Sequence, residues 1–153
     1  MVTELKEGVY WVGVVDWALK KFHGQELSTH RGSSYNSYLI IDEKVTLVDT
    51  VWSPFQKQLI ENISEIIDPS KIDIVVANHA EVDHSSSLPE VMRHAPNASV
   101  VVSPRGRESI EGHFHQPWNF RVVKTGDKII SGRMTWSLSK LRCSIGPIAC
   151  SHI

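Results

Sequence analysis

Apolar residues gather in short runs along the chain, and their spacing indicates an alternation of strands and helices. Dense β-branched and aromatic runs predict strands over residues 9–15, 35–41, 45–50, 72–77, 99–102 and 121–124. The run at 72–77 is apolar throughout, as in strands that are buried on both faces. Helices are predicted from Ser53 to about Asp68, over 88–94 and over 105–113. This alternation predicts an α/β fold with layers around a sheet.

Serine–proline pairs mark the expected start of two of these helices. Ser53 and Ser103 are expected as N-caps, each followed by a proline in the first turn. Residues 16–31 instead mix charge, histidine and glycine without a clean period. That segment is therefore expected to be a surface loop.

The stretch Asn78-His79-Ala80-Glu81-Val82-Asp83-His84 follows the buried strand predicted at 72–77. In an extended loop, residues two apart point the same way, so His79, Glu81 and Asp83 are expected to converge on one side. His84 then turns toward a second point nearby. Imidazole with carboxylate is a ligand set for zinc or iron, and the carboxylates favour iron or manganese. The alternative is an acidic loop that merely caps the next helix.

The chain resembles a known family in this stretch and around it. The pattern H-x-[EH]-x-D-H after a buried strand resembles the metallo-β-lactamase fold, and glutamate at Glu81 resembles its flavodiiron proteins, above all the flavorubredoxin branch. The zinc hydrolases of the superfamily carry histidine there. The segments that match the family in order include 22–24, 31–40, 49–51, 112–113, 118–120 and 122–127.

This resemblance implies a fold and a set of ligands. It implies an αββα sandwich of which residues 1–130 form about the first half, so that one apolar sheet face is expected to lie open. His79 and Glu81 are then expected to bind one iron, and Asp83 and His84 the other, with further ligands from sequence that this chain lacks. His23 falls in the family's Phe-His-Gly element, near the second metal in the substrate pocket. The alternative for His23 is a solvated loop histidine.

The resemblance also implies a reaction and its partners. Flavodiiron proteins reduce dioxygen or nitric oxide at a di-iron site. Their electrons come from FMN in a flavodoxin-like domain, across a head-to-tail dimer, after delivery by a rubredoxin-type donor. We therefore expect an N-terminal fragment of such an oxidoreductase that is inactive by itself. Two alternatives stay open, a zinc-dependent hydrolase of the superfamily and a non-catalytic remnant that binds metal weakly or not at all.

The resemblance stops after Asp127, and the tail that follows has an unusual explanation. The family continues into a segment F-x-E-x-P-M-L-H-W-P-D-S-M-x-T-Y. Codons compatible with residues 139–152, read one base back, spell E-A-P-M-L-H-W-P-D-S-M-F-T-Y. We expect residues 131–153 to be out of frame after one insertion or deletion near codons 128–137. The alternative is a genuine divergent tail, in which Cys143, Cys150 and His152 become candidate ligands.

Composition narrows the remaining possibilities. The 153 residues suit one domain, and the apolar share of 41% is ordinary for a globular protein. A net charge of -1 gives no electrostatic case for nucleic acid or a membrane surface. The first residues lack the basic and apolar regions of a signal peptide, and no apolar run approaches roughly 18 residues. A cytoplasmic protein is expected.

Overall fold

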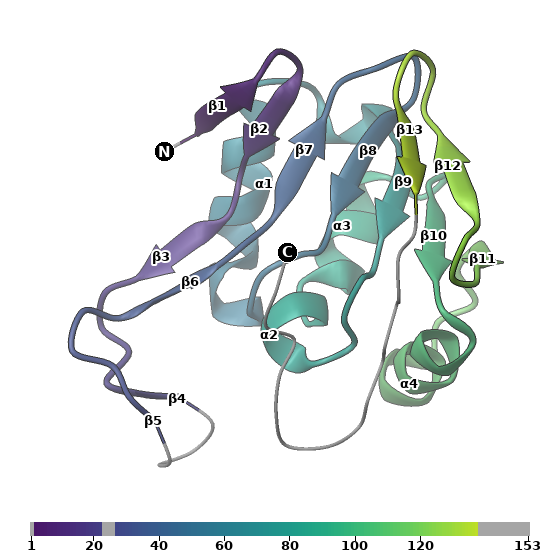
Figure 1. Cartoon of the computed structure of the whole chain (residues 1–153). Helices are drawn as coiled ribbons and strands as arrows, with labels where there is room; N and C mark the ends of the chain where they lie inside the picture. Colours follow the sequence, from purple (N-terminus) through teal and green to yellow (C-terminus); the bar gives the residue numbers. More distant parts are fainter. Residues whose placement is uncertain (1, 23–26, 138–153) are drawn as a thin grey trace.

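The core of the fold is one mixed seven-stranded sheet, in the order β1-β2-β7-β8-β9-β10-β11 (Figure 1). The computed structural model describes residues 2–22 and 27–137. The strands of this sheet are β1 (Thr3–Lys6), β2 (Val9–Trp11), β7 (Tyr38–Ile40), β8 (Val45–Val48), β9 (Ile72–Val76), β10 (Ser99–Val102) and β11 (Phe120–Val122). The predicted α/β class is confirmed.

The direction of the strands determines where polar side chains collect. Strands β1, β2, β7 and β8 pair antiparallel, whereas β8, β9, β10 and β11 run parallel. Parallel strands require crossover connections, and helices make them here. The carboxyl ends of parallel strands meet at one edge of the sheet, which is where ligand sites form in such folds. Asp49 after β8 and Asn78 after β9 lie at this edge.

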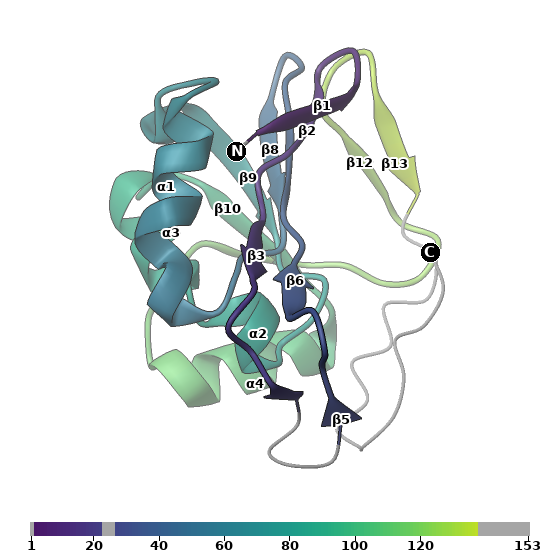
Figure 2. The ribbon, with the colours of Figure 1, turned by 90° about the vertical axis from the view of Figure 1, so that its left-hand side faces the viewer.

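Helices cover one face of the sheet (Figure 2). They are α1 (Gln56–Ser64), which follows the 3₁₀ turn η1 (Ser53–Phe55), α3 (Leu88–His94) and α4 (Pro104–Phe114). A second 3₁₀ turn, η2 (Pro69–Lys71), precedes β9. Leu39 and Leu47 from the sheet and Leu59 and Ile63 from α1 are fully buried in this layer. In the part of the chain that the structure describes, no helix is long and apolar enough to cross a membrane.

Two helix starts test the expected caps. Ser103 caps α4 as predicted, because its hydroxyl accepts a hydrogen bond from the Gly106 amide at 3.0 Å. The prediction for Ser53 is wrong. Ser53 lies inside η1, and its amide donates to the Ser86 hydroxyl at 2.8 Å, so this start is fixed by a contact from a distant segment.

A hairpin covers part of the opposite sheet face, which was expected to lie open. It consists of β12 (Lys128–Ile130) and β13 (Thr135–Ser137), and it stands on the far side of the sheet from the helices (Figure 2). Ile129 packs there in a small core with Val76, Val101 and Val123. The second layer is therefore started by this hairpin.

Residues 16–31 were expected to be a loop, but the described part of them forms an arm. Strands β3 (Val14–Asp16) and β6 (Ser33–Tyr35) pair as a ribbon that leads into β4 (Lys21–Phe22) and β5 (Leu27–Ser28). The arm extends away from the main sheet (Figure 1). Gly32, at φ +77°, lies so close to the Asp16 carbonyl that an added Cβ would be 2.0 Å from it. Only glycine fits this crossing.

Asp42 fastens the β12–β13 hairpin to the turn between β7 and β8. Its carboxylate accepts hydrogen bonds from the amides of Met134 at 2.7 Å and Arg133 at 3.2 Å and from the Ser131 hydroxyl at 3.1 Å. The hydrogen bond donated by the Met134 amide is the main reason that the pKa of Asp42 lies below 3.8, and partial desolvation opposes this shift. The ionised carboxylate is therefore the form that holds the hairpin.

We predict that Asp42→Asn loosens the hairpin at neutral pH. Because the pKa of Asp42 is lower in the folded chain, its stabilisation is complete above about pH 4 and is lost as the pH falls through the lowered pKa. Amide hydrogen exchange of β12 and β13 measures this loss. Asp68→Asn, which removes a carboxylate that accepts the Ser70 amide at 2.9 Å far from the hairpin, is the control. If the amides of β12 and β13 exchange no faster in Asp42→Asn, the Asp42 carboxylate does not hold the hairpin.

Candidate metal centre

The loop that follows β9 brings His79 and Glu81 together. His79 Nε2 lies 3.3 Å from Glu81 Oε2, as expected for two side chains that are two residues apart on extended backbone. The His79 side chain is largely buried, whereas that of Glu81 is 46% exposed. The other ring nitrogen of His79, Nδ1, is buried and has no hydrogen-bond partner among the described residues.

Asp83 and His84 form a second pair by a different route. The chain turns helical in α2 (Val82–Ser85), so Asp83 leaves the extended row, and the predicted convergence of His79, Glu81 and Asp83 is not observed. Instead His84 Nε2 lies 3.5 Å from Asp83 Oδ2. The Ser85 hydroxyl donates to the carbonyls of Ala80 at 2.9 Å and Glu81 at 3.0 Å, which ties this turn to the loop.

Asp49 is a residue of the candidate centre that the sequence reasoning did not single out. Its Oδ1 accepts the Asn78 amide at 2.7 Å and the His79 amide at 3.3 Å, and its Oδ2 lies 3.3 Å from His84 Nδ1. An ionised carboxylate only accepts hydrogen bonds, so a proton on Nδ1 of His84 would be donated to Asp49. Loss of the proton from Nε2 would then free that nitrogen to bind a metal beside Asp83. The sequence signal that could have identified it is an aspartate directly after the strand β8, which pairs with β9.

Backbone geometry places Asp49 for this task. It has a left-handed backbone, at φ 56°, which aspartate tolerates better than most residues. Its own carbonyl accepts the Ser37 hydroxyl at 2.9 Å. The Thr50 amide and hydroxyl then donate to the His84 carbonyl at 2.9 and 2.6 Å. Asp49 and Thr50 therefore fix the loop 78–84 to the end of β8 through hydrogen bonds.

The charge around His84 favours its protonated form. Burial lowers the pKa of His84, but the hydrogen bond and charge of Asp49, with the charges of Asp83 and Glu81, raise it above 6.5 overall. The ring centroids of His79 and His84 lie 5.1 Å apart, and the two rings meet edge to face. The loop is thus an acidic environment that is suited to a cation.

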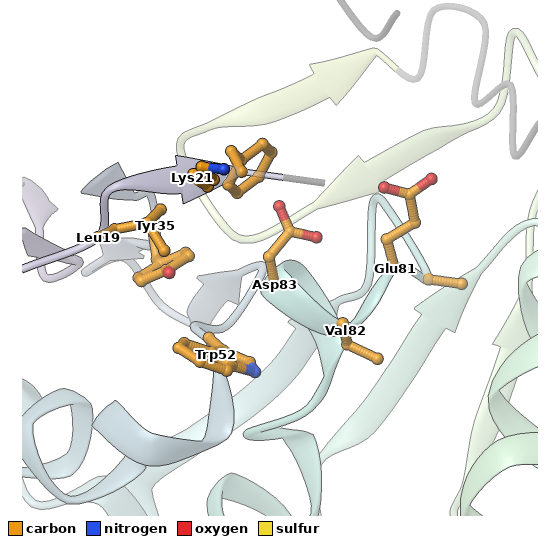
Figure 3. Close-up of a pocket in the computed structure, with 9 residues that line it drawn as sticks. Leu19, Lys21, Tyr35, Trp52, Glu81, Val82 and Asp83 are labelled. Atoms are coloured by element: carbon orange, nitrogen blue, oxygen red, sulfur yellow. The ribbon is translucent and has the colours of Figure 1, made fainter. Parts of the chain in front are cut away.

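A cavity of about 510 Å³ opens beside the loop (Figure 3). Glu81 and Asp83 line it from the loop, and Lys21 and Leu19 line it from the arm. Its remaining wall is mostly apolar and is formed by Phe22, Tyr35, Trp52, Ala80 and Val82. The arm therefore completes the cavity at the candidate metal centre.

Tyr35 is held in this wall by its neighbours. Its ring packs against Phe55 and Trp52, with centroids 5.6 and 6.1 Å away. Its hydroxyl donates to Asp16 Oδ2 at 3.4 Å. Burial, together with the charge and hydrogen bond of Asp16 and the charge of Asp83, raises the pKa of Tyr35 to about 12. The phenol consequently stays neutral at physiological pH.

Other candidates lie outside the described residues. His23 is one of them, although its neighbour Phe22 lines the cavity. Cys143, Cys150 and His152 of the tail are the others. Their expected roles are not addressed by the structure.

The loop residues fit iron in donor type and contribute part of a site. Each imidazole faces a carboxylate, the mixed donor set that suits iron. Among the residues that the structure describes, no group of three or more such side chains is arranged to hold one metal ion. The arrangement is therefore that of two imidazole–carboxylate pairs, each of which could contribute two donors to a half-site.

We predict that Asp49→Ala lowers the free energy of unfolding by about 1–3 kcal/mol, because it leaves the partly buried amides of Asn78 and His79 without an acceptor. Asp49→Asn should cost less, since an amide oxygen still accepts from Asn78. Urea denaturation measures both. Asp73→Ala, which removes a carboxylate from the Val45 amide at a more exposed position, is the matched control and should cost less than Asp49→Ala. Equal costs would contradict the role of Asp49.

We predict that Asp16→Asn lowers the pKa of Tyr35 from about 12 toward its ordinary value of 10.0. The pKa should stay above 10.0, because burial is the largest cause of the shift. NMR titration of labelled tyrosine rings measures it, with Tyr35→Phe to assign the signal. Asp83→Asn should lower this pKa less than Asp16→Asn does, and the reverse order would contradict the arrangement.

Comparison with known proteins agrees with this architecture. The sequence profile of the metallo-beta-lactamase superfamily matches residues 30–140. A nitric oxide reductase from Moorella thermoacetica is 45% identical over 130 residues, which are 84% of this chain and 33% of that protein. The chain therefore spans about a third of the length of this relative.

Solved structures give the same assignment. Rubredoxin oxygen:oxidoreductase from Desulfovibrio gigas superposes with a TM-score of 0.89 at 36% identity, over 93% of this chain and 35% of that one. The flavodiiron protein from Giardia intestinalis superposes with a TM-score of 0.82 at 37% identity, over 88% and 33%. The chain belongs to the metallo-beta-lactamase superfamily, and the flavodiiron proteins are among its structural neighbours.

Proposed function

We propose that this chain supplies the first ligand loop of a di-iron site that reduces dioxygen or nitric oxide. The observation that carries the proposal is the pairing of each imidazole with a carboxylate, at 3.3 Å for His79 with Glu81 and 3.5 Å for His84 with Asp83. His79 and Glu81 would hold one iron, and Asp83 and His84 the other. Such a metal pair supplies redox chemistry at two adjacent centres when it is bound.

The chain's own residues would prepare this site for a small substrate. Asp49 orients His84, and the turn α2 presents Asp83 beside it. The wall that includes Phe22, Tyr35 and Trp52 places apolar side chains beside the carboxylates. His23, next to Phe22, is proposed to reach the same pocket.

Electron supply is assigned to sequence beyond this chain. The similar proteins are about three times as long. We propose that FMN, a rubredoxin-type donor and a dimer partner serve the whole protein in the cytoplasm. Repeated turnover at such a site would require a supply of electrons, which the flavin would provide. The out-of-frame origin of residues 131–153 is part of the same proposal.

Anaerobic titration of the metal-free chain with Fe(II) tests the proposal. We predict binding in the low micromolar range, weakened at least about tenfold in the double variant Glu81→Gln/Asp83→Asn. The double variant should still fold, because Asp49, which holds the loop, is unchanged.

The hydrolase alternative has its own measurement. Glutamate at Glu81 replaces the imidazole of the zinc hydrolases, so the zinc-loaded chain should cleave neither a β-lactam nor a thioester. Hydrolysis that is abolished by Glu81→Gln would favour the zinc enzyme over the proposal. Equal iron binding by the chain and the double variant would favour the non-catalytic remnant.

A further inference from the structure

The two imidazole–carboxylate pairs of the loop differ in how firmly the chain holds them. His84 has a carboxylate at each ring nitrogen, with Asp49 Oδ2 3.3 Å from Nδ1 and Asp83 Oδ2 3.5 Å from Nε2. His79 has Glu81 3.3 Å from Nε2, but its buried Nδ1 has no hydrogen-bond partner among the described residues. Within the described part of the chain, only His84 therefore has a hydrogen-bond acceptor at the ring nitrogen that faces away from its carboxylate partner in the loop.

An acceptor behind a ligand histidine has a specific effect. It fixes which nitrogen carries the proton, orients the ring, and makes the free nitrogen a stronger donor to the metal. Asp49 provides this for His84, and Asp49 is itself fixed by the amides of Asn78 and His79 at 2.7 and 3.3 Å. The His84 ring is therefore already oriented before a metal arrives, with Nδ1 toward Asp49 and Nε2 toward Asp83.

The two carboxylates differ in the same direction. The Asp83 side chain is 21% exposed and stands on the turn α2, whereas the longer Glu81 side chain is 46% exposed. A longer and more exposed side chain loses more rotamer freedom when it is immobilised on a metal. Thr50 further holds the Asp83–His84 pair through its two hydrogen bonds to the His84 carbonyl.

We propose that a divalent metal binds first and more tightly at Asp83 and His84, with Asp49 as the positioning residue of that half-site. The His79–Glu81 half-site fills second and more weakly. This inference rests on the proposed function only in that the loop binds metal at all. Unequal loading then follows from the contacts of this chain's own residues.

Titration of the metal-free chain with Co(II), followed by calorimetry and by the visible absorption of the ion, tests the order. The matched variants are Asp83→Asn and Glu81→Gln, each of which removes one carboxylate charge and keeps the shape. We expect Asp83→Asn to weaken the first binding event at least about tenfold and to change its spectrum, and Glu81→Gln to leave both nearly unchanged.

Asp49→Asn tests the positioning role. The oxygen of the new amide can accept the Asn78 amide while its NH₂ group faces His84 Nδ1, which moves the imidazole proton to Nε2 and blocks that nitrogen. We expect a first event weakened about 10–100-fold with the same Co(II) spectrum at saturation, because the ligands are unchanged. A residue with a merely structural role would change the unfolding curve without this loss of affinity.

The outcomes separate the two proposals. A first event that is weakened by Glu81→Gln, or equally by both carboxylate variants, overturns the order of loading and leaves the metal-binding function intact. Two equal binding events in the unmodified chain overturn it as well. If the folded chain binds no Co(II), both the inference and the proposed function fail. Unfolding curves of every variant confirm that the comparison is made on folded protein.

Discussion

The carboxylate of Asp49 is the contact on which the candidate metal centre depends. It stands at the end of β8 and links that strand to the start of the loop after β9, through the amides of Asn78 and His79, and to the side chain of His84. Because β8 and β9 are parallel neighbours, their ends meet, and one short side chain spans both. The geometry of the loop therefore depends on the order of the strands, because Asp49 can bond to the loop only where β8 and β9 are neighbours.

The rest of the fold serves this edge of the sheet. Helices α1 and α3 bury one face of the sheet, while the hairpin β12–β13 begins to cover the other. The arm brings Leu19 and Lys21 over the loop and so turns a sheet edge into a cavity. In relatives about three times as long, further sequence is available to complete both the second layer and the ligand set.

Sequence reasoning succeeded where periodicity or ligand density was high and failed where a distant contact decided the outcome. The apolar run of β9 and the serine cap at Ser103 are local signals, and both elements are present. The start at Ser53 is determined by Ser86, which no local pattern reveals. The helical turn at Val82 and the role of Asp49 depend on the neighbouring strand in the same way. Contacts between segments far apart in the chain were thus the missing information.

The tautomer of His84 tests this account most directly. Nitrogen-15 NMR of the histidine rings, recorded above the raised pKa of His84, distinguishes a proton on Nδ1 from one on Nε2. The account predicts a single tautomer for His84 with the proton on Nδ1, and loss of that preference in Asp49→Asn. A proton on Nε2 in the unmodified chain, or a preference that persists in Asp49→Asn, would show that Asp49 does not orient the ring.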